Sequence, residues 1–262
     1  MFRLSPHRLP AVARWFDSGA PESSALAEHV AATGVGAWWG DRALSPRAVA
    51  VSCAGNVLFR GDPGALTPEL VAPFAHSRVE APPDFLPLFR TAFDRVVPAE
   101  RLVYAHREPV AAPRPPRGVT VRRLRAADAG ALARLHPAAA WIHASWGGPE
   151  GLAASGHGWA AFDRGGRVLT VACGYFAGTT HEQLAVLTPT EHRHERLALA
   201  CVAALCAEVT ARGRTASWSC GRGNRLSRLL AWTAGFRLER EYVRHVTGAA
   251  TARPQSPPRV SA

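Results

Sequence analysis

The sequence contains no lysine, and this absence changes how its basic charge is interpreted. All 31 basic residues are arginine, against 20 acidic residues, so the formal net charge is +11. An arginine-only basic set, together with abundant alanine, proline and glycine, is typical of a GC-rich coding sequence. Because the arginines are scattered, with no block of five or six, we expect a solvated basic surface, which argues against a nucleic-acid partner.

Cysteine and histidine patterns that bind metals are also missing. The five cysteines include no Cys-x-x-Cys pair, and the histidines form no His-Glu-x-x-His sequence. We therefore expect reduced, buried thiols in a cytoplasmic protein, and no metal. No apolar run approaches the ~20 residues of a membrane span, and the first ten residues lack the apolar core of a signal peptide, so no membrane partner is expected.

Composition and proline spacing predict two domains. The chain has 262 residues, 47% of hydrophobic type, enough for two modest cores of ~100–150 residues each. Residues 108–118 carry four prolines and predict an extended linker. We therefore expect an N-terminal α+β domain at 1–107 and a second domain at 119–247. Residues 248–262 have little to bury and predict a disordered tail.

The N-terminal half shows structural patterns but no catalytic constellation. Residues 48–53 and 56–60 predict a hairpin joined by Ala54 and Gly55. Helices are predicted at 67–75 and 85–93, and a strand at 102–105. This mixture is typical of an α+β domain.

In the second half, strands are expected at 119–125, 159–163 and 168–176, and a helix from Asp128. From residue 182 the order becomes strand, turn and helix. Leu184 to Leu187 is an apolar run of strand length, Pro189 ends it, and an apolar helix extends from Leu197 to about Arg212. The free N–H groups and the dipole of such a helix start favour an anion beyond the end of the strand.

This segment resembles the cofactor loop of the GNAT acetyltransferase superfamily, Arg/Gln-x-x-Gly-x-Gly/Ala. Arg193 and Ala198 fit the pattern, whereas Arg196 replaces the middle glycine and His194 stands where a second glycine is common. A second GNAT signature is matched by residues 218–236, in which Asn224 follows a strand and Gly235-Phe236 ends a helix. The resemblance implies an α+β fold: a C-terminal, mostly antiparallel mixed sheet flanked by helices, preceded by a smaller GNAT-like domain.

The resemblance also implies an activity, namely acetyl-CoA-dependent N-acetylation of an unidentified small-molecule amine by direct attack in a ternary complex. Glu182 is the expected general base, and His181 is the fallback. The implied cofactor-binding residues are Val186, Leu187, Arg193, His194, Glu195, Arg196, Leu197, Ala198, Asn224 and Ser227.

Two alternatives remain open at this stage. Many superfamily members use a tyrosine as acid toward the leaving thiolate, and by register that position is Ala231, with Trp232 beside it. The missing tyrosine, Arg196 and His194 therefore also suit a GNAT-like binding or regulatory protein that has lost acetyl transfer. Either protein is expected to be a monomer or a homodimer.

Overall fold

The computed structural model describes residues 1–5, 14–16, 23–193 and 196–251, and the chain divides into two compact units. Unit 1 comprises Met1–Glu100 and the segment from Tyr242 onward, and unit 2 comprises Arg101–Glu241. Residues 108–118, where the sequence predicts the domain boundary, fall inside unit 2 of this division. The N–H groups of Arg107 and Glu108 both donate to the carbonyl of Gly235, which ties the start of this segment to unit 2.

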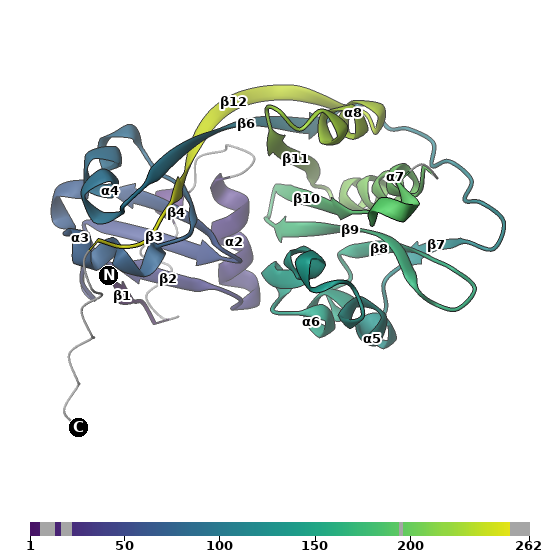
Figure 1. The fold of residues 1–262 in the computed structure, drawn as a ribbon, viewed down its shortest axis with the longest axis horizontal. Coiled ribbons are helices and arrows are strands. Elements are labelled where there is room, and N and C mark those ends of the chain that lie inside the picture. Colours follow the sequence, from purple (N-terminus) through teal and green to yellow (C-terminus); the bar gives the residue numbers. More distant parts are fainter. Residues whose placement is uncertain (6–13, 17–22, 194–195, 252–262) are drawn as a thin grey trace. The chain divides into compact units, whose positions relative to one another are not determined.

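Unit 1 is a mixed sheet with short helices (Figure 1). Its strand order is β1-β2-β3-β4-β5-β12, and every pairing is antiparallel except that of β4 with β5. Its elements are β1 Phe2–Arg3, the 3-10 turn η2 Arg14–Phe16, α2 Ser23–Thr33, β2 Ala37–Gly40, β3 Ala48–Cys53, β4 Asn56–Gly61, η3 Pro63–Ala65, α3 Pro68–Val71, η4 Ala72–Phe74, β5 Arg78–Glu80, η5 Pro83–Phe85 and α4 Leu86–Ala92. The apolar spacing of residues 7–16 also predicts a short helix, and most of these residues lie outside the described part of the chain.

Unit 2 contains the longest described helix, α7, and a sheet in the order β6-β11-β10-β9-β8-β7, in which only β10 and β11 are parallel. Its elements are β6 Val96–His106, β7 Thr120–Arg123, η6 Ala126–Asp128, α5 Ala129–Ala133, η7 Pro137–Trp146, α6 Pro149–Ala154, β8 Gly158–Phe162, β9 Val168–Ala177, β10 His181–Leu187, η8 Thr190–His192, α7 Leu197–Ala211, β11 Thr215–Gly221, α8 Arg225–Thr233 and β12 Phe236–Thr247. The predicted mixed, mostly antiparallel α+β fold is confirmed.

The two units exchange their last strands. Both units follow the sequence of three antiparallel strands, helix, strand, helix and final strand. The final strand of the first series, β6, pairs with β11 of unit 2, from Arg101 opposite Gly221 to Ala105 opposite Ser217. The final strand of the second series, β12, pairs with β5 of unit 1 through His245 opposite Val79. Each unit is therefore completed by a strand from the other half of the chain.

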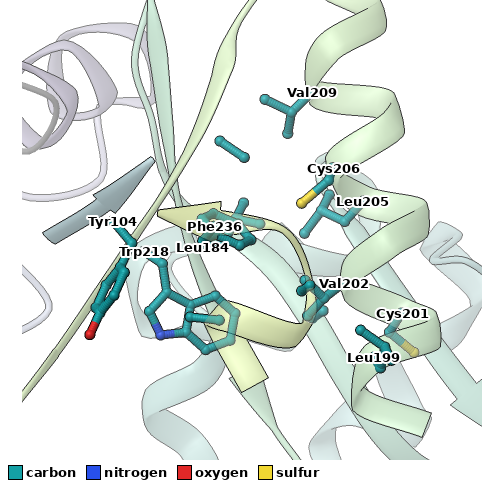
Figure 2. Packing of buried hydrophobic residues seen from close by; sticks show 14 of the residues in the cluster. Tyr104, Leu184, Leu199, Cys201, Val202, Leu205, Cys206, Val209, Trp218 and Phe236 are labelled. Atoms are coloured by element: carbon teal, nitrogen blue, oxygen red, sulfur yellow. The ribbon is translucent and has the colours of Figure 1, made fainter. Parts of the chain in front are cut away.

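Two apolar cores fix the sheet of unit 2. One lies between the sheet and helix α7, and Figure 2 shows Val202, Leu205 and Cys206 projecting from that helix toward Leu184 and Phe236. The other packs α5, α6 and η7 against the opposite face. Because α7 is apolar nearly all round, it is buried along most of its length, as such a sequence requires. This burial holds its first residue in place relative to β10.

Two types of site receive no support from the described residues. None of the described helices has both the length and the apolar content needed to cross a membrane. No group of three or more metal-binding side chains gathers within the same part of the chain. The five cysteines are buried, and burial raises the pKa of Cys173, Cys201 and Cys206 to about 12.

Candidate functional site

The parallel strands β10 and β11 separate halfway along their length. They pair from His181 opposite Thr215 to Leu184 opposite Trp218. Beyond that point, residues 185–187 pair only with β9, and residues 219–221 pair only with β6. The separation begins beside a register shift between Gln183 and Leu184, and such a bulge bends a strand. The two strands therefore leave backbone groups on their facing edges.

Those backbone groups belong to two residues that the sequence predicted for the cofactor site. In an antiparallel ladder, alternate residues direct their N–H groups toward one neighbour, so β10 also directs N–H groups away from β9. The side chain of Val186 packs against the core under α7, and that of Leu187 packs against the core on the opposite face. With their side chains packed to either side, Val186 and Leu187 alternate along β10, so one of the two directs its backbone N–H and carbonyl away from β9.

Helix α7 starts beyond this separation and has no side-chain cap. Its first helical hydrogen bond runs from the N–H of Ala200 to the carbonyl of Arg196, at 3.1 Å. The N–H groups of Leu197, Ala198 and Leu199 therefore have no acceptor within the helix. A 15-residue helix whose first amides have no acceptor within the helix is suited to bind a phosphate group.

Arg196 keeps the backbone conformation of the glycine that it replaces in the family pattern. Its φ of 55° and ψ of 17° lie in the left-handed region, which favours glycine. The chain therefore turns into α7 as it would with glycine, at a cost of about 1 kcal/mol. Its side chain is exposed, as is that of Arg193, while His194 and Glu195 lie outside the described residues.

Another arginine contacts the loop before α7, and sequence reasoning did not single it out. Arg167, in the turn between β8 and β9, places its Nη2 2.8 Å from Nε2 of His192. In the same loop, Nε–H of Arg193 donates to the carbonyl of Thr188 at 3.4 Å. The approach to α7 therefore carries guanidinium groups from two separate segments. Only tertiary structure brings Arg167 here, because a hairpin turn in the sequence carries no signal of what its side chains meet.

Asn224 and Ser227 hold the neighbouring helix in place. Oδ1 of Asn224 accepts a hydrogen bond from the N–H of Ser227 at 3.1 Å and so caps α8. Oγ of Ser227 accepts one from Nε1–H of the buried Trp218 at 2.9 Å. Since β10 and β11 are parallel and each leads into a helix, the starts of α7 and α8 lie at the same edge of the sheet.

Glu182, predicted to be the general base, is instead a fully buried carboxylate with cationic partners. Arg212 donates to it from Nε and Nη2, both at 2.9 Å, and Arg214 donates from Nη1 at 3.0 Å. Nδ1 of His157 lies 3.0 Å from its Oε2. Burial raises the pKa of Glu182, but the hydrogen bonds and charges of His157 and Arg212 outweigh burial and lower it to about 2. These contacts argue against proton abstraction by Glu182.

The surroundings of Glu182 are tightly packed at the bulge in β10. The ring of His157 stacks on Trp146, with centroids 5.1 Å apart, and Nε1–H of Trp146 donates to the carbonyl of Gly174 at 2.8 Å. A Cβ atom at Gly174 would lie 2.9 Å from Oε2 of Glu182. The cluster therefore fixes the strand immediately before the separation. Sequence reasoning missed His157, Arg212 and Arg214, because nothing in a sequence tells which of many arginines meets a buried carboxylate.

The other predicted acid–base positions differ in accessibility. His181 is partly exposed, and its Nδ1 lies 3.0 Å from Oγ1 of Thr180. Ala231, the register position of the superfamily tyrosine, is completely buried in the core, and Trp232 beside it is 59% exposed. Neither Ala231 nor Trp232 has an acidic side chain. His181 is therefore a more accessible candidate for proton transfer than the buried Glu182.

Comparisons with known proteins agree on one family. A family model described as GNAT acetyltransferase matches residues 100–244. The uncharacterized N-acetyltransferase in the mutA 5′ region of Streptomyces virginiae is 69% identical over 212 residues, which cover 81% of this chain and 90% of that relative.

Solved structures share the fold over nearly the whole chain. A GCN5-related N-acetyltransferase-like protein from Streptococcus suis matches with a TM-score of 0.69 and 17% identity, covering 92% of this chain and 98% of that one. A tandem GNAT protein from the clavulanic acid biosynthesis pathway matches with a TM-score of 0.61 and 13% identity, covering 97% and 98%. The second match fits the two similar strand–helix series described above.

Proposed function

Because the chain belongs to the GNAT acetyltransferase family, we propose that it transfers the acetyl group of acetyl-CoA to the amine of a small molecule. The observation that carries this proposal is the separation of β10 from β11 at the edge where α7 begins with free amides. This edge of the sheet thus offers strand backbone groups to the amide-containing pantetheine arm of acetyl-CoA, and it offers the first amides of α7 to the diphosphate. The proposed location is the cytoplasm.

In this proposal, residues 193–198 hold the pyrophosphate. The amides of Leu197 and Ala198 donate to its oxygens, and Arg193 and Arg196 supply positive charge. His194 and Glu195 belong to the same proposed loop. The pantetheine arm lies along Val186 and Leu187, and Asn224 with Ser227 borders it from the start of α8.

The reaction is a direct transfer. The neutral amine attacks the thioester carbonyl carbon, a C–N bond forms, and an N–H of the separated part of β10 stabilises the oxyanion. The C–S bond then breaks, and the thiolate leaves with the electron pair. A base removes the amine proton, and His181 is proposed for that role because its ring is partly exposed. Because position 231 is alanine rather than the superfamily tyrosine, solvent protonates the thiolate.

Calorimetric titration of acetyl-CoA into the full chain tests the cofactor site. We expect one site per chain, because the unit 1 helix equivalent to α7 is α3, with only four residues. Desulfo-CoA, which keeps the diphosphate, is expected to bind at the same stoichiometry. Absence of binding by both would remove the enzyme assignment.

A catalytically degenerate binding protein is the second candidate. It is favoured by the buried Ala231 and by the ion pairs that occupy Glu182. The two candidates differ in turnover: acetyl-CoA binding without free thiol release across a panel of polyamines, amino sugars and aminoacyl compounds supports the binding protein. Thiol release with any of these amines supports the transferase.

A further inference from the structure

Helix α8 presents large apolar side chains to solvent. Leu226 is 70% exposed, Leu229 is 63% exposed and Trp232 is 59% exposed. Residues three apart lie on the same side of a helix, so these three form one stripe along about two turns. The opposite side, with Ala231 and Ala234, is completely buried. The three stripe residues therefore do not contribute to the packing of α8 against the rest of the protein. A run of exposed apolar residues of this kind marks an interaction surface.

Arginines accompany this apolar stripe. By helical periodicity, Arg225 falls on the arc between Leu229 and Trp232, and Arg228 lies at its border. Both are exposed, and no described carboxylate forms an ion pair with either. The guanidinium of Arg237 packs on one face of the Trp232 ring, 4.1 Å from the ring centroid, and restricts the movement of that ring. Tryptophan and arginine are the residue types enriched in binding hot spots.

We propose that the exposed face of α8 docks an acidic amphipathic helix of a partner protein. Leucines of that helix pack on Leu226, Leu229 and Trp232, and its carboxylates pair with Arg225 and Arg228. The inference does not depend on acetyl transfer, because it rests only on the outer side of α8.

Charge placement selects this occupant over two others. A second copy docking through the same face would bring arginines against arginines across a two-fold axis. A lipid surface binds helices whose arginines lie on the polar side, whereas Arg225 falls within the apolar arc of α8. A protein helix can place a carboxylate opposite Arg225 and apolar groups on either side of it.

The probe is a fluorescein-labelled peptide of about 18 residues, long enough to form a helix, with leucine at i, i+3, i+4 and i+7 and mostly glutamate elsewhere. Fluorescence anisotropy with the full chain is expected to show micromolar binding. Combined Leu226→Ser and Leu229→Ser is expected to weaken it about tenfold or more. Arg225→Glu with Arg228→Glu is expected to do the same. Leu44→Ser, which alters an equally exposed leucine of unit 1, is the matched control and is expected to bind normally.

Three results would overturn the proposal. The first is equal binding of a scrambled peptide of the same composition, or equal weakening by Leu44→Ser. The second is no peptide binding but sedimentation with phosphatidylglycerol vesicles that the leucine variants lose. The third is a dimer in analytical ultracentrifugation that the same variants dissociate. Thermal melts of each variant show that folding is retained, as expected for residues this exposed.

Discussion

Glu182 shows how a single buried carboxylate links stability to pH. Its folded-state pKa of about 2 is depressed from the ordinary glutamate value of 4.5, so its contribution to stability is fully present above about pH 4.5 and is lost as the pH falls toward 2. The depression corresponds to roughly 3 kcal/mol at neutral pH. The partners responsible for the depressed pKa are His157 and Arg212, and the guanidinium groups of Arg212 and Arg214 would lose this counter-charge if Glu182 were neutral.

We predict that Glu182→Gln lowers the free energy of unfolding at pH 7 by about 3–5 kcal/mol. The deficit relative to wild type is expected to shrink toward pH 3, because wild type then begins to lose the same charge. Urea unfolding at both pH values measures it, and Glu191→Gln, which changes an exposed carboxylate, serves as control. A deficit that stays constant with pH would contradict the ion-pair explanation.

Arg196 combines a glycine-like backbone with an exposed cation. We predict that Arg196→Gly raises the free energy of unfolding by about 0.5–1 kcal/mol, because glycine adopts φ 55° without strain. The same change is expected to weaken acetyl-CoA binding about five- to tenfold through loss of a phosphate contact.

The variant Arg196→Ala separates these two effects. Alanine keeps the strained backbone and lacks the guanidinium, so we expect weaker acetyl-CoA binding with no gain in stability. Chemical denaturation and calorimetry on both variants measure the two quantities. A large gain in affinity with glycine would instead show that the arginine obstructs the site.

At the scale of elements, the bulge in β10 requires that Gly174 of the neighbouring strand β9 has no side chain. A Cβ at Gly174 would press on the Oε2 atom of Glu182, which cannot move away because Arg212 and His157 hold it. We predict that Gly174→Ala destabilises the protein by about 1–3 kcal/mol. Gly223→Ala is the matched control, since nothing lies within 4 Å of its added Cβ. Equal melting temperatures for the two variants would contradict this packing.

The sequence predicted most elements around the site, because their signals are local. The apolar run of β10, the apolar α7, the Asn224 cap and the hairpin before β9 are visible in the residues themselves. The separation of β10 from β11 depends on strand pairing, which no local pattern specifies. The ion pairs of Glu182 depend on contacts 25 to 32 residues apart, and neither periodicity nor capping rules specify such contacts.

On the scale of the whole molecule, the strand exchange determines whether either half of the chain can fold independently. The proline-rich segment was predicted to separate the domains, yet β6, which precedes it, completes unit 2 by pairing with β11. No pattern within β6 identifies its partner strand, because strand pairing across more than a hundred residues leaves no periodic signal.

We predict that a fragment of residues 119–262 does not fold cooperatively, because the edge of β11 is left unpaired and the core loses Leu102 and Tyr104. Circular dichroism melts of the fragment and of the full chain compare them, and adding back a peptide of residues 96–107 is the control. A cooperative transition in the fragment alone would contradict the prediction.

The exchange also sets an order of events at the ribosome. Strand β5 emerges before the elements of the second series, whereas its partner β12 follows them. Until β12 is made, the nascent first half exposes an edge to its surroundings, and unpaired strand edges make a partly folded chain prone to aggregate. The sheet of unit 1 is therefore completed only after the strands and helices of the second series have been translated.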